Sequence, residues 1–453
     1  MSAHSPHILF VNPWIHDFAA FDFWARPLGL LQLAAMVRSH GMSVSYIDCL
    51  NRFHPKDMQP SKKRYRHGRG PYLKTKISKP KALQSTTRQY SRYGILPDWL
   101  IQDLKSLEQP DVIMLTSFMT YWYPGVQETI ACIRSVFKEV PIVLGGIYVR
   151  LCLDHAKTYM DADYFEIGQG EASIFSIIEQ LTGFKATIDI DVTNLDTLPY
   201  PAWDLQSSIP FIPLLTTRGC PFRCSYCASG FLEPNIRRHS IAHVLDEILF
   251  WHQAYGVCDF VFYDDALLYQ SETYAVPLFE KIIQKQLPIR FHTPNAIHIR
   301  EITPKIAFLM FKAGFKNLRM GLETTDFEHR IDQKLTYNEF EQAVQYLKQA
   351  GFKRDDMGAY LMIGLPGQKK ETIIESIDQV SNSGIQPILA YYTPIPHTKL
   401  WAEAVGCSPF DISNEPLFTN NTLFPCQKNG LDWQILYEYK QHAGKGLNVE
   451  NAH

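Results

Sequence analysis

From residue 211 onward, the sequence repeats one pattern, a short apolar segment followed by a helical segment. Six of the apolar segments predict strands, at residues 211–219, 258–265, 288–295, 316–324, 357–367 and 387–396. Strands joined by helices in this way run parallel, because the chain must cross back before each new strand starts. Six such units predict an incomplete barrel of the TIM type, whose ligands bind at the carboxyl ends of the strands.

The predicted helices between these strands carry start and stop signals. Ser240 precedes a stripe of apolar residues with helical spacing and is expected to cap that helix. Thr303 followed by Pro304 predicts the start of another helix, which Gly314 should end.

The first part of the chain, residues 1–195, predicts a separate α/β domain. Its β-branched runs, such as HILFVNP, DVIMLTS and PIVLGG, alternate with helical patterns. This alternation is typical of a doubly wound, Rossmann-like parallel sheet with helices on both faces. A proline-rich linker at 195–205 leads to the partial barrel at 196–400, and residues 401–453 are expected to be an extension that covers the active site.

Residues 52–98 interrupt this first domain as a basic insertion. They contain thirteen Lys or Arg residues and few acids. One interpretation is a basic arm over an anionic substrate, including phosphate or nucleic acid. The other is a solvated insertion whose charge only keeps it in solution, and the sequence leaves both open.

Composition narrows the class of protein. With 46% hydrophobic and 20% charged residues, the chain has a globular composition rather than that of a disordered protein. No apolar run is long enough for a membrane span and no signal peptide precedes the first strand, so we expect a cytoplasmic protein. Nine mostly solitary cysteines argue against a disulfide framework.

One group of cysteines needs its own explanation. The segment TRGCPFRCSYC, at 217–227, has three cysteines in a C-x3-C-x2-C spacing. A structural zinc site needs four ligands, but Cys258 lies at the start of a predicted strand and His239 precedes a helix, which disfavours zinc. A four-iron cluster held by three thiolates keeps one iron open, and an open iron can bind a small ligand.

The same residues resemble a known family, the radical S-adenosylmethionine (SAM) enzymes. CPFRCSYC is similar to their signature loop, which follows the first barrel strand and has an aromatic residue before the third cysteine. The segments YDD, PN, RMGLET, MIGLPGQ and YTPIPHTKL resemble the later strand-end motifs of the subgroup with an N-terminal cobalamin-binding domain. The resemblance covers about residues 1–400.

The resemblance implies roles for particular residues. Cys220, Cys224 and Cys227 would bind a [4Fe-4S] cluster. Residues implied to contact SAM are Tyr226, Asp265, Asn295, Arg319, Glu323, Gly364, Pro366, Pro394 and Ile395. Asp264 and Asp265 have the alternative of capping the next turn, and Arg319 that of a salt-bridged strand face.

Cobalamin is a further candidate cofactor that the resemblance suggests. Gly145 and Gly146 match the glycine pair that accommodates its nucleotide tail, but the loop NPWIHDFAAF lacks the D-x-H-x-x-G pattern that supplies an axial histidine in many cobalamin domains. The rings at 121–123 either flank a corrin or fill its place. An auxiliary cluster on Cys49, Cys132 and Cys152 is a less favoured alternative.

These observations predict a radical SAM enzyme, most plausibly a cobalamin-dependent C-methyltransferase. A radical SAM oxidoreductase or cyclase without cobalamin is the alternative within enzymes. A non-catalytic iron–sulfur or zinc protein that binds nucleic acid through the basic insertion is the alternative from another class. The family resemblance further implies a small or anionic substrate and an electron donor such as flavodoxin or ferredoxin.

Overall fold

The computed structural model describes residues 5–58, 66–330, 332, 334–427 and 433–444. Two compact units account for the chain: residues 1–210 together with 414–418, and residues 211–413 together with 419–453. Within the described residues, no helix is both long and apolar enough to cross a bilayer.

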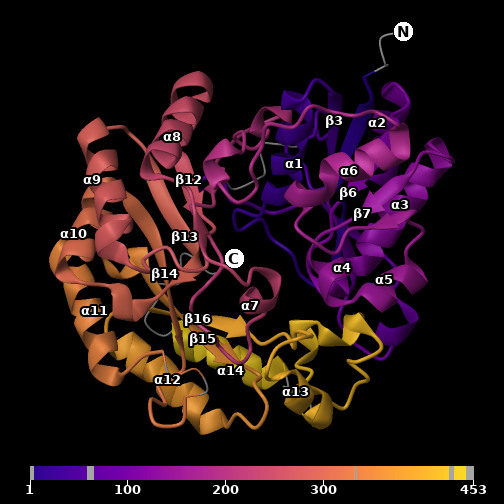
Figure 1. The fold of residues 1–453 in the computed structure, drawn as a ribbon. Helices are drawn as coiled ribbons and strands as arrows, with labels where there is room; N and C mark the ends of the chain where they lie inside the picture. Colours follow the sequence, from indigo (N-terminus) through magenta and orange to yellow (C-terminus); the bar gives the residue numbers. More distant parts are fainter. Residues whose placement is uncertain (1–4, 59–65, 331, 333, 428–432, 445–453) are drawn as a thin grey trace. The chain divides into compact units, whose positions relative to one another are not determined.

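The first unit is built on a parallel sheet (Figure 1). The strands of the unit are β1 (His7–Asn12), β2 (Ile15–Asp17), β3 (Ser43–Asp48), β4 (Lys74–Lys76), β5 (Ser91–Tyr93), β6 (Val112–Leu115), β7 (Ile142–Leu144) and β8 (Tyr164–Phe165). Five of them pair in the order β3-β1-β6-β7-β8. The order reverses between β1 and β6, and doubly wound sheets bind ligands at the carboxyl ends of the strands at such a point.

Helices cover both faces of this sheet, which confirms the predicted doubly wound α/β class. They are α1 (Leu28–Ser39), α2 (Pro97–Ser106), α3 (Tyr123–Val136), α4 (Ile147–Leu151), α5 (Leu153–Tyr159) and α6 (Gly170–Thr182). Ile8 and Phe10 of β1 pack with α1 and α6 in one core. The alternate residues Leu9 and Val11 are equally buried, so apolar side chains fill both faces. Leu195 in the predicted linker also belongs to this core.

The basic insertion at 52–98 is folded onto the first unit, apart from residues 59–65, which lie outside the described part. Its strands β4 and β5 pair antiparallel with each other, and β5 also pairs with β2. Several of its cations have partners: Arg52 binds the fully buried Asp22, and Arg92 binds Glu128. These charges therefore hold the insertion in place.

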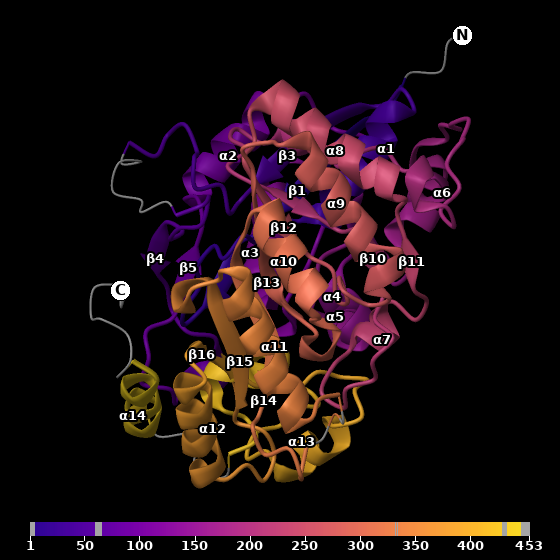
Figure 2. The same ribbon diagram turned by 90° about the vertical axis from the view of Figure 1, so that its left-hand side faces the viewer.

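The second unit contains a six-stranded parallel sheet in the order β16-β15-β14-β13-β12-β9, the predicted set (Figure 2). The strands of the unit are β9 (Ile212–Leu214), β10 (Thr217–Arg218), β11 (Arg237–Arg238), β12 (Asp259–Phe262), β13 (Arg290–Ile297), β14 (Phe315–Glu323), β15 (Met357–Ile363) and β16 (Gln386–Tyr391). The edge strands β9 and β16 are not paired with each other, so the sheet is an open, partial barrel.

Two of the helices of the second unit have the start and stop residues that the sequence predicts. The helices of the unit are α7 (Ser229–Leu232), α8 (Ile241–Tyr255), α9 (Ala275–Lys285), α10 (Pro304–Ala313), α11 (Tyr337–Ala350), α12 (Lys370–Asn382), α13 (Trp401–Cys407) and α14 (Trp433–Gly444). Ser240 and Thr303 accept hydrogen bonds at the starts of α8 and α10, and Gly314 ends α10 in a left-handed conformation. Consecutive helices from α8 to α11 lie along one face of the sheet (Figures 1 and 2).

Candidate functional site

The cysteine loop begins at the carboxyl end of β9, and a buried aspartate anchors its base. Asp264, which follows β12, accepts hydrogen bonds from the backbone and hydroxyl of Thr216 (3.2 and 2.6 Å) and from the backbone N–H of Thr217 (2.6 Å). Burial raises the pKa of Asp264 to about 6, an effect that these three donors oppose. Asp264 therefore attaches the loop to the neighbouring strand end.

The turn into the loop requires a glycine. Gly219 has φ +80°, and a Cβ at this position would lie 2.6 Å from the carbonyl oxygen of Asn235. The short strand β10, which precedes this turn, pairs antiparallel with β11, which follows α7, and the pair closes the base of the loop.

Three free thiols lie on this one loop. Cys220 and Cys224 are half-buried and Cys227 is exposed. Burial raises the pKa of Cys220 to about 11 and also raises that of Cys224, so these two thiols keep their protons in the absence of a bound cation. Three soft sulfur donors on one accessible loop suit iron or an iron–sulfur cluster.

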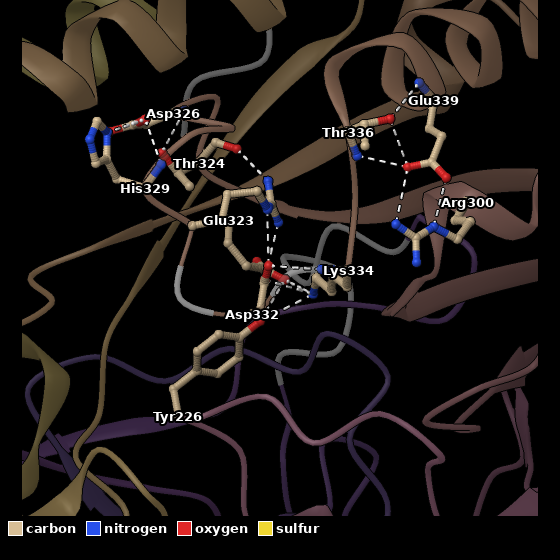
Figure 3. A network of polar contacts seen from close by, with 11 residues as sticks. Tyr226, Arg300, Glu323, Thr324, Asp326, His329, Asp332, Lys334, Thr336 and Glu339 are labelled. Carbon is tan, nitrogen blue, oxygen red and sulfur yellow. Dashed lines mark hydrogen bonds and ion pairs between the residues drawn. The ribbon is translucent and has the colours of Figure 1, made fainter.

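A polar network includes Tyr226 of the cysteine loop (Figure 3). The Tyr226 hydroxyl donates to Glu323 (3.1 Å) at the end of β14, and Lys334 contacts both residues. Asp332 accepts from Arg330 (2.9 Å) and lies 3.7 Å from the Lys334 ammonium. Glu323 adopts φ +64°, which turns the chain out of the strand. Two carboxylates and two cations balance their charges here.

Of three other predicted residues, Asp265 and Asn295 lie toward the ends of neighbouring strands, whereas Arg319 lies in the middle of β14. The side chain of Asp265 bonds Ser229, and burial raises its pKa. Asn295 is exposed in β13 and donates to the carbonyl of Tyr263 (2.6 Å) at the end of β12. Arg319 donates to the carbonyl of Leu318 (3.0 Å) in its own strand.

The predicted adenine residues form a turn and a loop at the ends of β15 and β16. The Gln368 side chain accepts from the backbone N–H of Gly364 (2.8 Å) and donates to Met362 (2.8 Å), which shapes the turn that contains Pro366. In the loop after β16, Pro394 is buried, and Ile395 accepts a hydrogen bond from Thr398 (2.7 Å).

The loop after β16 also holds the cysteine loop in place. Leu400 donates its backbone N–H to the carbonyl of Ser225 (2.9 Å), which lies between two of the cysteines. His397 stacks on Phe231 of α7, with ring centroids 4.2 Å apart. The first and last strands of the sheet thus both support the thiols.

In the first unit, the glycine pair lies after β7, at the carboxyl edge of the sheet. A Cβ on Gly146 would lie 2.2 Å from the carbonyl oxygen of Ser117 after β6, and the Ser117 hydroxyl donates to Gly145 (2.6 Å). Because Gly146 has no side chain, the loops after β6 and β7 can approach each other at the carboxyl edge of the sheet.

The same edge presents apolar side chains. Phe118 after β6 and Ile167 after β8 are 57% and 56% exposed, and such side chains suit an apolar ligand. Tyr121 and Tyr123 point instead into the unit and are buried. His16, which lies in β2 in the segment after β1, is buried, and its Nε2 pairs with Glu128 (2.8 Å), so this nitrogen is not available as an axial ligand.

Sequence reasoning missed part of the site. Lys334, Asp332 and Arg330 lie in the connection from β14 to α11, where we identified no motif. The capping box Thr336–Glu339 is the sequence signal that could have located these residues. It marks the start of α11, so the residues before it must form the loop that follows the carboxyl end of β14.

Comparisons with known proteins agree with this geometry. Residues 214–380 match the Radical SAM superfamily model. An uncharacterised methyltransferase of Pyrococcus horikoshii is 23% identical over 69% of this chain and 74% of its own length. Cytidylyl-2-hydroxyethylphosphonate methyltransferase of Streptomyces wedmorensis is 20% identical over 88% of this chain and 81% of its own.

A solved structure shares the fold of both units. The radical S-adenosylmethionine methyltransferase TsrM of Kitasatospora setae, solved with its tryptophan substrate and a SAM analogue, is 17% identical. It superimposes with a TM-score of 0.64, over 89% of this chain and 76% of its own. A second structure of that protein contains cobalamin and a [4Fe-4S] cluster. Residues 214–380 therefore form a domain of the Radical SAM superfamily, and both units share the fold of a radical SAM methyltransferase that was solved with cobalamin and a [4Fe-4S] cluster.

Proposed function

We propose that this protein is a cobalamin-dependent radical SAM methyltransferase. The observation that carries the proposal is the loop of three free thiols at the carboxyl end of the first strand of a partial barrel, within the part that matches the superfamily. The TsrM fold and the two methyltransferase relatives support the choice of methyl transfer.

Cys220, Cys224 and Cys227 would hold the [4Fe-4S] cluster. A cluster bound there would supply the electron for reductive cleavage of SAM. The chain's contribution is to hold the thiols: Asp264 and Leu400 bind the loop from two sides. We expect the electron to come from a donor of the flavodoxin or ferredoxin type.

Residues at the other strand ends would hold SAM. Glu323 is the strongest candidate, because its carboxylate already binds the ammonium of Lys334 and can accept the hydrogens of an amino group or a ribose. Asp265, Asn295 and Arg319 would lie near the methionine or ribose. The backbone beside Tyr226, the turn at 364–366 and the loop at 393–395 would receive the adenine.

Cobalamin would bind at the carboxyl edge of the first sheet, where it would supply the methyl group for transfer. Phe118 and Ile167 offer an apolar surface there, and Gly145 and Gly146 follow β7 at the same edge. Because His16 is paired with Glu128, we expect cobalamin to bind without an axial ligand from the segment after β1.

The test begins with anaerobic reconstitution of the full chain with iron, sulfide and cobalamin. Incubation with SAM and a reductant should then give 5′-deoxyadenosine or S-adenosylhomocysteine, and the visible spectrum should show bound cobalamin. Cys224→Ala should abolish product formation, whereas Cys258→Ala, which removes a half-buried thiol outside the loop, should not.

Two outcomes separate the alternatives. SAM cleavage without bound cobalamin would refute methyl transfer and favour the oxidoreductase or cyclase. If neither product forms and Cys224→Ala binds as much iron as the unmodified chain, the enzymatic role of the loop is wrong.

A further inference from the structure

Two cysteines of the C-terminal extension lie side by side in the second unit. Cys407 is the last residue of α13, and Cys426 follows the short 3₁₀ helix Asn421–Leu423. The Cys407 sulfur lies 3.8 Å from the carbonyl oxygen of Cys426 and 3.5 Å from that of Ala404. Both thiols are free.

The two thiols differ in their access to solvent. Cys426 is only 4% exposed, and burial, followed by the neighbouring Cys407, raises its pKa. Cys407 is half-buried and is therefore the thiol that a soluble oxidant reaches first. An accessible thiol next to a buried one is the arrangement in which an attacked cysteine is resolved by its neighbour.

The surroundings of the pair include an unsatisfied polar group. Tyr392, which follows β16, is 3% exposed, and its hydroxyl has no hydrogen-bond partner among the described residues. Burial and then the charges of Cys426 and Cys407 raise the pKa of Tyr392. A buried hydroxyl without a partner is costly.

The pair also bounds a segment that contacts the candidate SAM site. Phe424 lies against Gly364, where a Cβ would be 3.3 Å from its ring, and its ring centroid is 5.6 Å from that of Tyr391. Gln427 donates to the carbonyl of Leu365 (3.1 Å). The residues on both sides of Cys426 thus contact the turn at 364–368.

We propose that Cys407 and Cys426 form a reversible disulfide that closes residues 408–425 and restrains the turn at 364–368. The oxidant is a small-molecule disulfide such as oxidised glutathione. Cys407 attacks it and releases one reduced glutathione, and Cys426 then displaces the second. Two thiols lose two electrons and two protons, and one glutathione disulfide becomes two thiols. Disulfide formation does not depend on the proposed function.

The test keeps the full chain in buffers of reduced and oxidised glutathione and then alkylates the remaining free thiols. Peptide mapping reports each cysteine separately, so reactions of the cysteine loop do not interfere. As the buffer becomes more oxidising, protection of Cys407 and Cys426 should rise together to about ten-fold above that of Cys258, and a cross-linked peptide should appear. Cys258 is the matched control because it too is half-buried and bonds a carbonyl oxygen.

The variants Cys426→Ser and Cys407→Ser should each abolish the cross-linked peptide. In Cys426→Ser, Cys407 should instead be recovered as a mixed disulfide with glutathione, because the resolving thiol is missing. The proposal is overturned if the unmodified chain gives this mixed disulfide alone, without the cross-linked peptide, or if both thiols stay fully reactive. Hydrogen exchange at 364–368 should slow on oxidation and stay unchanged in Cys407→Ser. Exchange that does not respond in the unmodified chain would refute the restraint of the turn.

Discussion

Replacement of Asp264 by alanine should destabilise the second unit and loosen the cysteine loop. The carboxylate accepts three hydrogen bonds from Thr216 and Thr217, both of which are 1% exposed. In Asp264→Ala the threonine hydroxyl can rotate to another acceptor, but the two backbone N–H groups are left unpaired at about 1–3 kcal/mol each. We expect a loss of about 3 kcal/mol in the free energy of unfolding, and a smaller loss in Asp264→Asn, which keeps one acceptor oxygen.

Two measurements on the metal-free chain check this prediction. Urea unfolding gives the stability, and the alkylation rates of Cys220 and Cys224 report whether the loop has loosened. Asp246→Ala is the matched control, because Asp246 is exposed on α8 and its loss should change stability by no more than about 0.5 kcal/mol. If Asp264→Ala behaves like this control in both measurements, Asp264 does not anchor the loop.

Three further substitutions test other parts of the second unit. Gly219→Ala should lower the stability measured by thermal unfolding by at least about 1–2 kcal/mol, because alanine would be forced into φ +80° and against Asn235. Gly230→Ala, which has open space around it, should be neutral, and equal effects of the two variants would contradict the need for glycine in the turn. Lys334→Met should lower the free energy of unfolding by about 3 kcal/mol, because it leaves Glu323 without its buried partner. If the effects of Lys334→Met and Glu323→Gln are additive in a double-mutant cycle, the two side chains are not energetically coupled. Burial raises the pKa of Glu247 to about 8, so protonated Glu247 stabilises the native state, and this stability is lost as the pH rises from about 4.5 to 8. Glu247→Gln should remove this pH dependence, which is worth up to about 5 kcal/mol in the free energy of unfolding. Parallel curves of stability against pH for the two proteins would refute the prediction.

Local sequence signals determined the architecture of both units. Alternating apolar and helical segments predict parallel sheets because only crossover helices can join parallel strands, and the caps at Ser240 and Thr303 act within one helical turn. The spacing of Cys220, Cys224 and Cys227 is equally local, since one short loop carries all three thiols. These features depend on neighbours along the chain, so they could be predicted without a structure.

Only the tertiary structure decided which distant side chains meet. Asp264 reaches Thr216 across 48 positions, and Tyr226 reaches Glu323 across 97, because parallel strands bring their carboxyl ends to one edge. Cys407 and Cys426 looked solitary in the sequence, yet the fold of the C-terminal extension places them together. Several cations of the basic insertion that looked available are paired with acids from elsewhere in the chain, such as Arg52 with Asp22 and Arg92 with Glu128, because a buried charge is stable only when it is paired. Pairings of this kind depend on packing in three dimensions, which residue spacing does not encode.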